Sequence, residues 1–181
     1  QGAMNAAVFM FNGDEHEGNN LGINLSYDVE MAGFNISYVD NLAESDGITD
    51  LTLSDEVAGM VNSLYLNFNH IGFNAEYLSS LEKFDAAALS FKGNGAQPES
   101  WNIELSYNTD VINYAIAYQG SDEAVELGLP ESKILAAAEI HIAENTTLSF
   151  ELAEEQDYSI ANGGDTGENT TTISAMLAAE F

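Results

Sequence analysis

Alternation of apolar and polar residues with a period of two is the feature that most constrains the fold of this chain. In the stretch 101–108 the odd positions are Trp, Ile, Leu and Tyr, and the even positions are Asn, Glu, Ser and Asn. Helical spacing cannot divide the residues in this way, whereas a strand places successive side chains on opposite faces. About ten such segments of roughly nine to twelve residues follow one another, which is the length of a tilted strand that crosses a membrane. The chain is therefore predicted to be all-β.

Composition limits what such a sheet can bind. The chain has 30 acidic residues against three lysines and no arginine, which gives a net charge of −27. Phosphate backbones would be repelled, so nucleic acid is not expected as a partner. The chain contains no cysteine, which excludes disulfides and thiol chemistry. The length of 181 residues fits one domain, 1–181, and Gln1 to Met4 resembles the remnant of an expression tag.

The connections between the alternating segments differ in length in a regular order. Short turns are expected near 28–32, 70–72, 108–111 and 143–145, and longer polar loops near 13–19, 41–59, 82–99, 120–132 and 155–168. Strict alternation of short and long connections is typical of outer-membrane barrels, in which short periplasmic turns lie at one end and long external loops at the other. Both chain ends then fall at the short-turn end, and the number of strands is even.

Aromatic residues lie near both ends of the predicted strands. Tyr27, Phe34, Phe68, Phe73, Tyr107 and Phe181 lie near short turns or the end of the chain, and Phe11, Tyr38, Tyr77, Trp101 and Tyr118 lie near long loops. Two aromatic belts are expected where a barrel meets the two membrane surfaces. A water-soluble β-sandwich also alternates, but it has no reason to form belts. The prediction is an antiparallel up-and-down transmembrane β-barrel with about ten strands.

A narrower resemblance covers nearly the whole chain. It rests on FNGD at 11–14, AEY at 75–77, FDAA at 84–87, YQGSDEA at 118–124, LPE at 129–131, ENTTL at 144–148, DYS at 157–159, GGDTG at 163–167 and the final strand that ends in Phe181. These stretches resemble the C-terminal region of LbtU-type siderophore porins. The resemblance implies an outer-membrane barrel associated with ferric-siderophore uptake. Members of that family are usually longer, and no binding residues can be carried over from them. The terminal strand also resembles those that the barrel assembly machinery recognises through a final aromatic residue, here Phe181.

The polar face of such a barrel would line its lumen. The predicted lumen residues are amides, carboxylates and one histidine: Asn24, Asn35, Asn67, Asn74, Glu76, Asn102, Glu104, Asn113, Gln119, Glu139, His141 and Glu151. Carboxylates in a pore favour cations. The alternative is that these side chains bond to one another and plug a narrow barrel.

The acidic residues are compatible with two other kinds of site. Acidic residues of the loops, Asp14, Glu15, Glu17, Asp157 and Asp165, are hard oxygen ligands of the kind that calcium prefers, although solvated loops are the default interpretation. Glu139, His141 and Glu151 combine imidazole with carboxylates, which suggests a metal site or an external protease. No nucleophile motif accompanies them, so the chain is predicted not to be an enzyme.

The function predicted from sequence is passage of a small solute through the cell outer membrane, with ferric siderophore as the solute that the resemblance implies. Membrane lipid and the solute are the expected partners, and no cofactor is expected. The alternative is a structural or adhesive barrel that does not transport and whose acidic loops bind cations.

Overall fold

The computed structural model describes residues 2–12, 19–44, 56–143, 145–164 and 166–179. A single antiparallel sheet of ten strands dominates it, and each strand pairs with the next in the order β1-β2-β3-β4-β5-β8-β9-β10-β11-β12. The strands are β1 (Ala3–Phe11), β2 (Asn20–Val29), β3 (Ala32–Val39), β4 (Gly59–Phe68), β5 (Ile71–Ser80), β8 (Glu99–Asn108), β9 (Ile112–Asp122), β10 (Ser132–Ala143), β11 (Thr146–Gln156) and β12 (Asn169–Ala179). The predictions of an all-β fold and of about ten antiparallel strands are confirmed.

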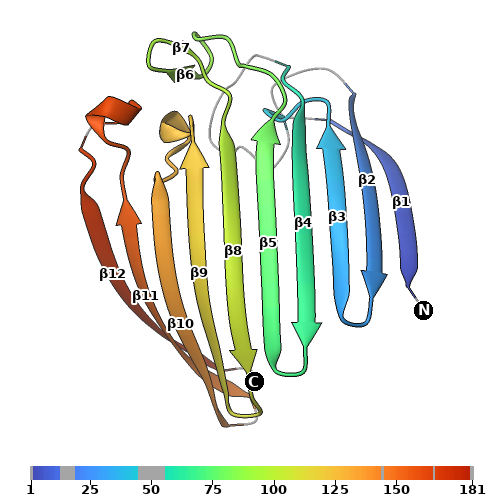
Figure 1. The fold of residues 1–181 in the computed structure, drawn as a ribbon, viewed down its shortest axis with the longest axis vertical. Helices are drawn as coiled ribbons and strands as arrows, with labels where there is room; N and C mark the ends of the chain where they lie inside the picture. The colour runs from blue at the N-terminus through green and yellow to red at the C-terminus, as the bar shows by residue number, and fades with distance from the viewer. Residues whose placement is uncertain (1, 13–18, 45–55, 144, 165, 180–181) are drawn as a thin grey trace.

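The sheet curves strongly, and β10 to β12 bend away from the plane of β1 to β5 (Figure 1). It is open in the part of the chain that the structure describes, because β1 and β12 are the two outermost strands and no pairing joins them. All short turns lie at one end of the sheet and the long connections at the other (Figure 1). β1 begins and β12 ends at the short-turn end, as the alternation of connection lengths predicted. Ala3 and Met4, which resemble part of an expression tag, form the first pairs of β1 with β2.

The two faces of the sheet have opposite character. On one face, which we call the apolar face, many large side chains are exposed, among them Ile116 (59%), Phe150 (45%) and Ile173 (80%). Alternate residues of the same strands form the other, polar face. A water-soluble sheet would have to cover so extensive an apolar surface, and nothing in the described chain covers it.

The best-buried apolar residues do not belong to the middle of the sheet. Leu42, Val57, Phe84, Leu89 and Ala96 form one cluster, and each is at most 4% exposed. They come from the connections β3–β4 and β5–β8, at the long-loop end. The β5–β8 connection contains a small hairpin of β6 (Ser90–Phe91) and β7 (Asn94–Gly95), which turns through positive φ at Lys92 and Gly93.

Two further connections join this cluster. The β9–β10 connection contains the 3-10 helix η1 (Val125–Leu127), and the β11–β12 connection contains η2 (Ile160–Asn162). The ring of Phe91 packs edge-on against Tyr158, with 6.4 Å between centroids, and Ser90 donates to Glu126 from both its backbone nitrogen and its hydroxyl. We call these packed connections the loop cap. The sequence predicted only polar loops here, because their few apolar residues lack periodicity.

Candidate functional site

All twelve residues predicted to line a lumen lie on the polar face. Their positions follow from the register, in which Asn24 is opposite Ser37, Asn74 is opposite Glu104 and Asn113 is opposite Glu139. The others are Asn35, Asn67, Glu76, Asn102, Gln119, His141 and Glu151. A slip of one residue in any strand would turn its polar side chains to the other face. Whether this face lines a closed lumen stays a prediction.

One cross-strand row of the polar face contains no apolar side chain on any of the ten strands. Pair by pair across the sheet, it consists of Asn5, Ser26, Asn35, Ser63, Glu76, Asn102, Gln119, Lys133, Glu155 and Thr170. Side chains directly opposite each other on neighbouring strands are close enough to interact. The row therefore forms a continuous hydrophilic track across the sheet, which we call the polar track.

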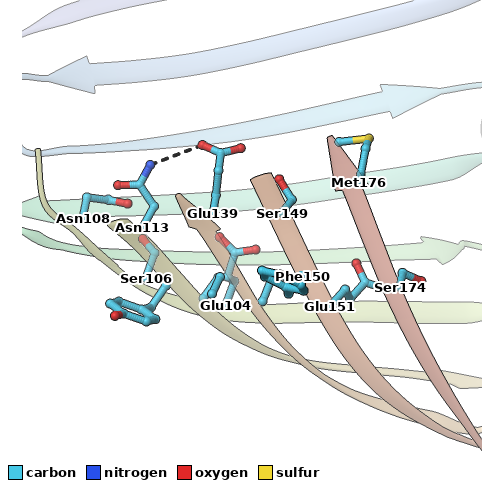
Figure 2. Close-up of a pocket in the computed structure, with 14 residues that line it drawn as sticks. Glu104, Ser106, Asn108, Asn113, Glu139, Ser149, Phe150, Glu151, Ser174 and Met176 are labelled. Atoms are coloured by element: carbon cyan, nitrogen blue, oxygen red, sulfur yellow. Dashed lines mark hydrogen bonds between the residues drawn. The ribbon is translucent and has the colours of Figure 1, made fainter. Parts of the chain in front are cut away.

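A groove of about 490 Å³ lies on the polar face toward the short-turn end. Its polar lining comes from five strands, β8 to β12, and includes Glu104, Asn113, Glu139, Glu151 and Ser174. Figure 2 shows the Asn113 amide pointing at the Glu139 carboxylate, with Ser149 and Met176 on the neighbouring strands. We call this hollow the acidic groove.

The carboxylates of the acidic groove have few partners that could neutralise them. Asn113 donates its amide N–H to Glu139 over 3.4 Å, and Asn74 donates to Glu104 over 3.4 Å. The His141 Nε2 atom lies 3.8 Å from a Glu139 oxygen. These long contacts leave the negative charge available to a mobile cation. Fixed charge on a low-dielectric wall focuses the field into the space in front of it.

The polar face of β2 and β3 behaves differently. Asn24 donates to both Asn35 and Ser37, with 2.7 Å to the Ser37 hydroxyl, and Asn35 donates to the same hydroxyl over 3.1 Å. These three neutral side chains satisfy one another. This cluster is hydrogen-bonded within itself, whereas the carboxylates of the acidic groove make only long contacts. Whether the polar face lines an open lumen or plugs one stays a prediction.

The described residues do not bring the candidate metal ligands together, and the prediction that the chain is not an enzyme stays a prediction. Within the described ranges, no three histidine or acidic side chains converge as metal ligands, and this includes Glu139, His141 and Glu151. Of the loop acids, Asp14, Glu15, Glu17 and Asp165 lie outside the described residues. Asp157 accepts a hydrogen bond from the Thr166 hydroxyl over 3.2 Å and is exposed.

Three features of the polar face escaped the sequence analysis. Phe9 lies there and covers Gly22, where a Cβ would come within 2.1 Å of the ring, because β1 is apolar at nearly every position and offers no alternation to follow. The Tyr65 hydroxyl donates to Asp28 over 3.1 Å. The Lys133 ammonium lies 2.6 Å from the Glu155 carboxylate. Of these features, only the Lys133–Glu155 ion pair could have been expected from the sequence, because Lys133 is the one lysine inside a predicted strand.

No helix among the described residues has the length and apolar character needed to cross a membrane. No family model matches the chain. It is similar to a UPF0422 protein of Coxiella burnetii, with 26% identity over 88% of the chain and 37% of that protein. It is also similar to the UPF0422 protein lpl2888 of Legionella pneumophila strain Lens, with 27% identity over 65% of the chain and 26% of that protein. The chain thus spans between a quarter and two fifths of the length of these relatives.

Proposed function

We propose that this chain forms part of an outer-membrane β-barrel that lets a small hydrophilic solute cross the membrane. Uptake of a ferric siderophore is the role that the resemblance to LbtU-type porins implies, and it is part of the proposal. The acidic groove and the polar track would line the route, and the apolar face would contact lipid. Recognition of Phe181 by the barrel assembly machinery completes the proposal, although that residue lies outside the described chain.

The observation that carries the proposal is the separation of an apolar and a polar face over the nine strands that follow β1. Lipid is the natural cover for an apolar face that the protein leaves exposed. Inside a bilayer every backbone N–H and C=O group has to be paired, and only a closed sheet pairs them all. We therefore propose that the edges of β1 and β12 are paired in the membrane, either with each other or with strands outside this chain. Relatives much longer than this chain are consistent with additional strands.

The charge of the acidic groove sets the expected selectivity. Glu104, Glu139 and Glu151 line it, while Lys133, the one lysine among the ten strands, is paired with Glu155. A negative lining favours cations in pores. The route should accordingly prefer cations and cationic or neutral solutes over free anions.

Planar-bilayer recording of the full-length protein tests the function. We expect discrete conductance with a reversal potential that favours cations, together with heat-modifiable mobility on gels. A monodisperse monomer that is soluble without detergent would exclude a barrel. An anion-selective pore would remove the groove carboxylates from the mechanism.

The hydrogen-bonded cluster of Asn24, Asn35 and Ser37 favours a second candidate, a structural or adhesive barrel that does not transport. In that case these side chains, with the loop cap, would close the interior. Properly inserted protein without measurable conductance would support this candidate over the first.

A further inference from the structure

A second, smaller hollow lies on the polar face beneath the loop cap, separate from the acidic groove. Its volume is about 190 Å³, and it is lined by Glu76, Ser100, Asn102, Gln119, Ser121 and Pro130 among others. The first five come from β5, β8 and β9, and Pro130 comes from the β9–β10 connection. We call it the cap pocket.

The floor of the cap pocket contains a carboxylate, on Glu76, and an unpartnered amide oxygen, on Asn102. Glu76, Asn102 and Gln119 are consecutive members of the polar track. The Asn102 Oδ1 atom is shielded from solvent and has no hydrogen-bond partner. A shielded acceptor without a donor is costly, and most buried polar atoms in proteins have a hydrogen-bond partner, either another protein group or an ordered water.

The charge of Glu76 is also unbalanced. The next cation along the same row is Lys133, and its ammonium is engaged by Glu155 at 2.6 Å. Lys92 lies over the Phe91 ring in the loop cap, 5.0 Å from the centroid. Among the described residues no basic side chain bonds to the Glu76 carboxylate, so the carboxylate can accept a hydrogen bond from an external donor.

The roof of the cap pocket is held in place by hydrogen bonds. The Ser121 hydroxyl donates to the Pro130 carbonyl over 2.7 Å, and the Ser121 backbone N–H donates to the Glu131 carbonyl over 3.2 Å. The Tyr158 hydroxyl lies 2.8 Å from the Ser121 hydroxyl, and the Asn162 amide donates to the Glu131 carboxylate over 2.7 Å. Burial raises the pKa of the Tyr158 phenol, so the phenol stays protonated and can donate. A pocket that is already shaped loses less entropy when a ligand binds.

We propose that the cap pocket binds the protonated primary amine of a small hydrophilic solute. A primary ammonium has donors and no acceptor, which complements the Glu76 carboxylate and the Asn102 carbonyl. The volume corresponds to about six waters at roughly 30 Å³ each, which suits an ammonium group with a few carbon atoms and excludes a whole iron–siderophore complex. The proposal rests on the proposed function to the extent that the polar face must be open to the solute.

The test is calorimetric titration of the full-length protein in detergent micelles with n-butylammonium chloride. Tetramethylammonium chloride is the matched probe, because it has the same charge and no N–H donor. We expect saturable binding of butylammonium only. E76Q should weaken it at least tenfold, and Asn102→Leu should weaken it without any change of charge.

Glu82→Gln provides the control variant, since it removes the same charge from an exposed position outside the pocket. Equal weakening by Glu82→Gln, equal binding of both probes, or no saturable binding would each overturn the proposal. Heat-modifiable mobility of every variant separates loss of the site from loss of the fold. Cation-selective conductance without amine binding would reject the amine site and leave the proposed function standing. Amine binding without conductance would reject the proposed function and leave the amine site standing.

Discussion

The loop cap and the sheet are stabilised in opposite ways. The loop cap buries its own apolar residues, with Leu89 only 1% and Phe84 only 2% exposed. The sheet leaves apolar residues such as Ile103 and Ile134 exposed at 46% and 60%. The loop cap covers its own apolar residues, whereas the apolar face of the sheet is left without cover by the described residues. Under the proposed function, lipid is what covers that face.

Close backbone packing makes the loop cap compact. The Phe84 N–H donates to the Ala96 carbonyl over 2.8 Å, and the Ala96 N–H donates to the Leu89 carbonyl over 2.9 Å. A Cβ on Gly95 would come within 1.8 Å of the Phe84 carbonyl oxygen. Only glycine fits at that position, so the hairpin and the buried ring depend on each other.

The largest effect is expected from Phe84→Ala, which should unfold the loop cap and leave the sheet intact. Removing a buried phenylalanine side chain costs about 3–5 kcal/mol. Trypsin is a suitable probe because the chain has only three lysines and no arginine: Lys83 and Lys92 lie in the loop cap, and Lys133 lies in β10. Cleavage in micelles should increase at the first two sites and stay slow at Lys133.

Phe150→Ala is the matched control for that experiment, since Phe150 lies on the apolar face of β11 and is 45% exposed. It should leave Lys83 and Lys92 as protected as in the unaltered protein. Equal cleavage at all three lysines of Phe84→Ala would mean that the loop cap and the sheet unfold as one unit.

A charge placed on the apolar face should have the next largest effect. Ile103→Asp directs a carboxylate at lipid and should reduce insertion, at a cost of about 2 kcal/mol. Ser106→Asp, on the polar face of the same strand, should be tolerated. Both variants are folded into lipid vesicles, and the inserted fraction is measured by heat-modifiable mobility on gels. Equal insertion of the two variants would mean that the faces are assigned wrongly.

A smaller effect is expected from Tyr158→Phe. The variant keeps the ring against Phe91 and loses the hydrogen bond to Ser121, which is worth about 1 kcal/mol. Hydrogen exchange should become faster at the backbone N–H of Ser121 and Ala124 and remain unchanged in β4. Unchanged exchange at both amides would show that the phenol does not hold the roof of the cap pocket.

The smallest effect concerns ion selectivity. Replacing Glu76, Glu104, Glu139 and Glu151 together by glutamine should lower the cation preference of the pore without abolishing conductance. The difference from the unaltered protein should shrink as salt approaches 1 M, where the Debye length falls to about 3 Å. Reversal potentials under a salt gradient measure the cation preference. If the variant keeps the preference of the unaltered protein, the selectivity comes from the loops and not from these four glutamates.

Alternation along the chain predicted about ten strands, the faces of the strands after β1, and the order of short and long connections. Alternation of the kind seen from Trp101 to Asn108 needs only local geometry, because successive side chains of a strand point to opposite sides. The placement of Asn102 and Glu104 on the polar face followed from it directly. In β1, where apolar residues occupy nearly every position, the same reasoning could not place Phe9.

Only the tertiary structure decided how the connections pack and where the pockets lie. Leu42, Phe84 and Tyr158 are far apart in the chain and share no periodicity, so their burial depends on contacts between loops that no local pattern encodes. The cap pocket likewise needs Pro130 from one connection above Glu76 and Asn102 from two strands. Pairing between strands fixes which side chains meet, and that pairing is a property of the whole sheet.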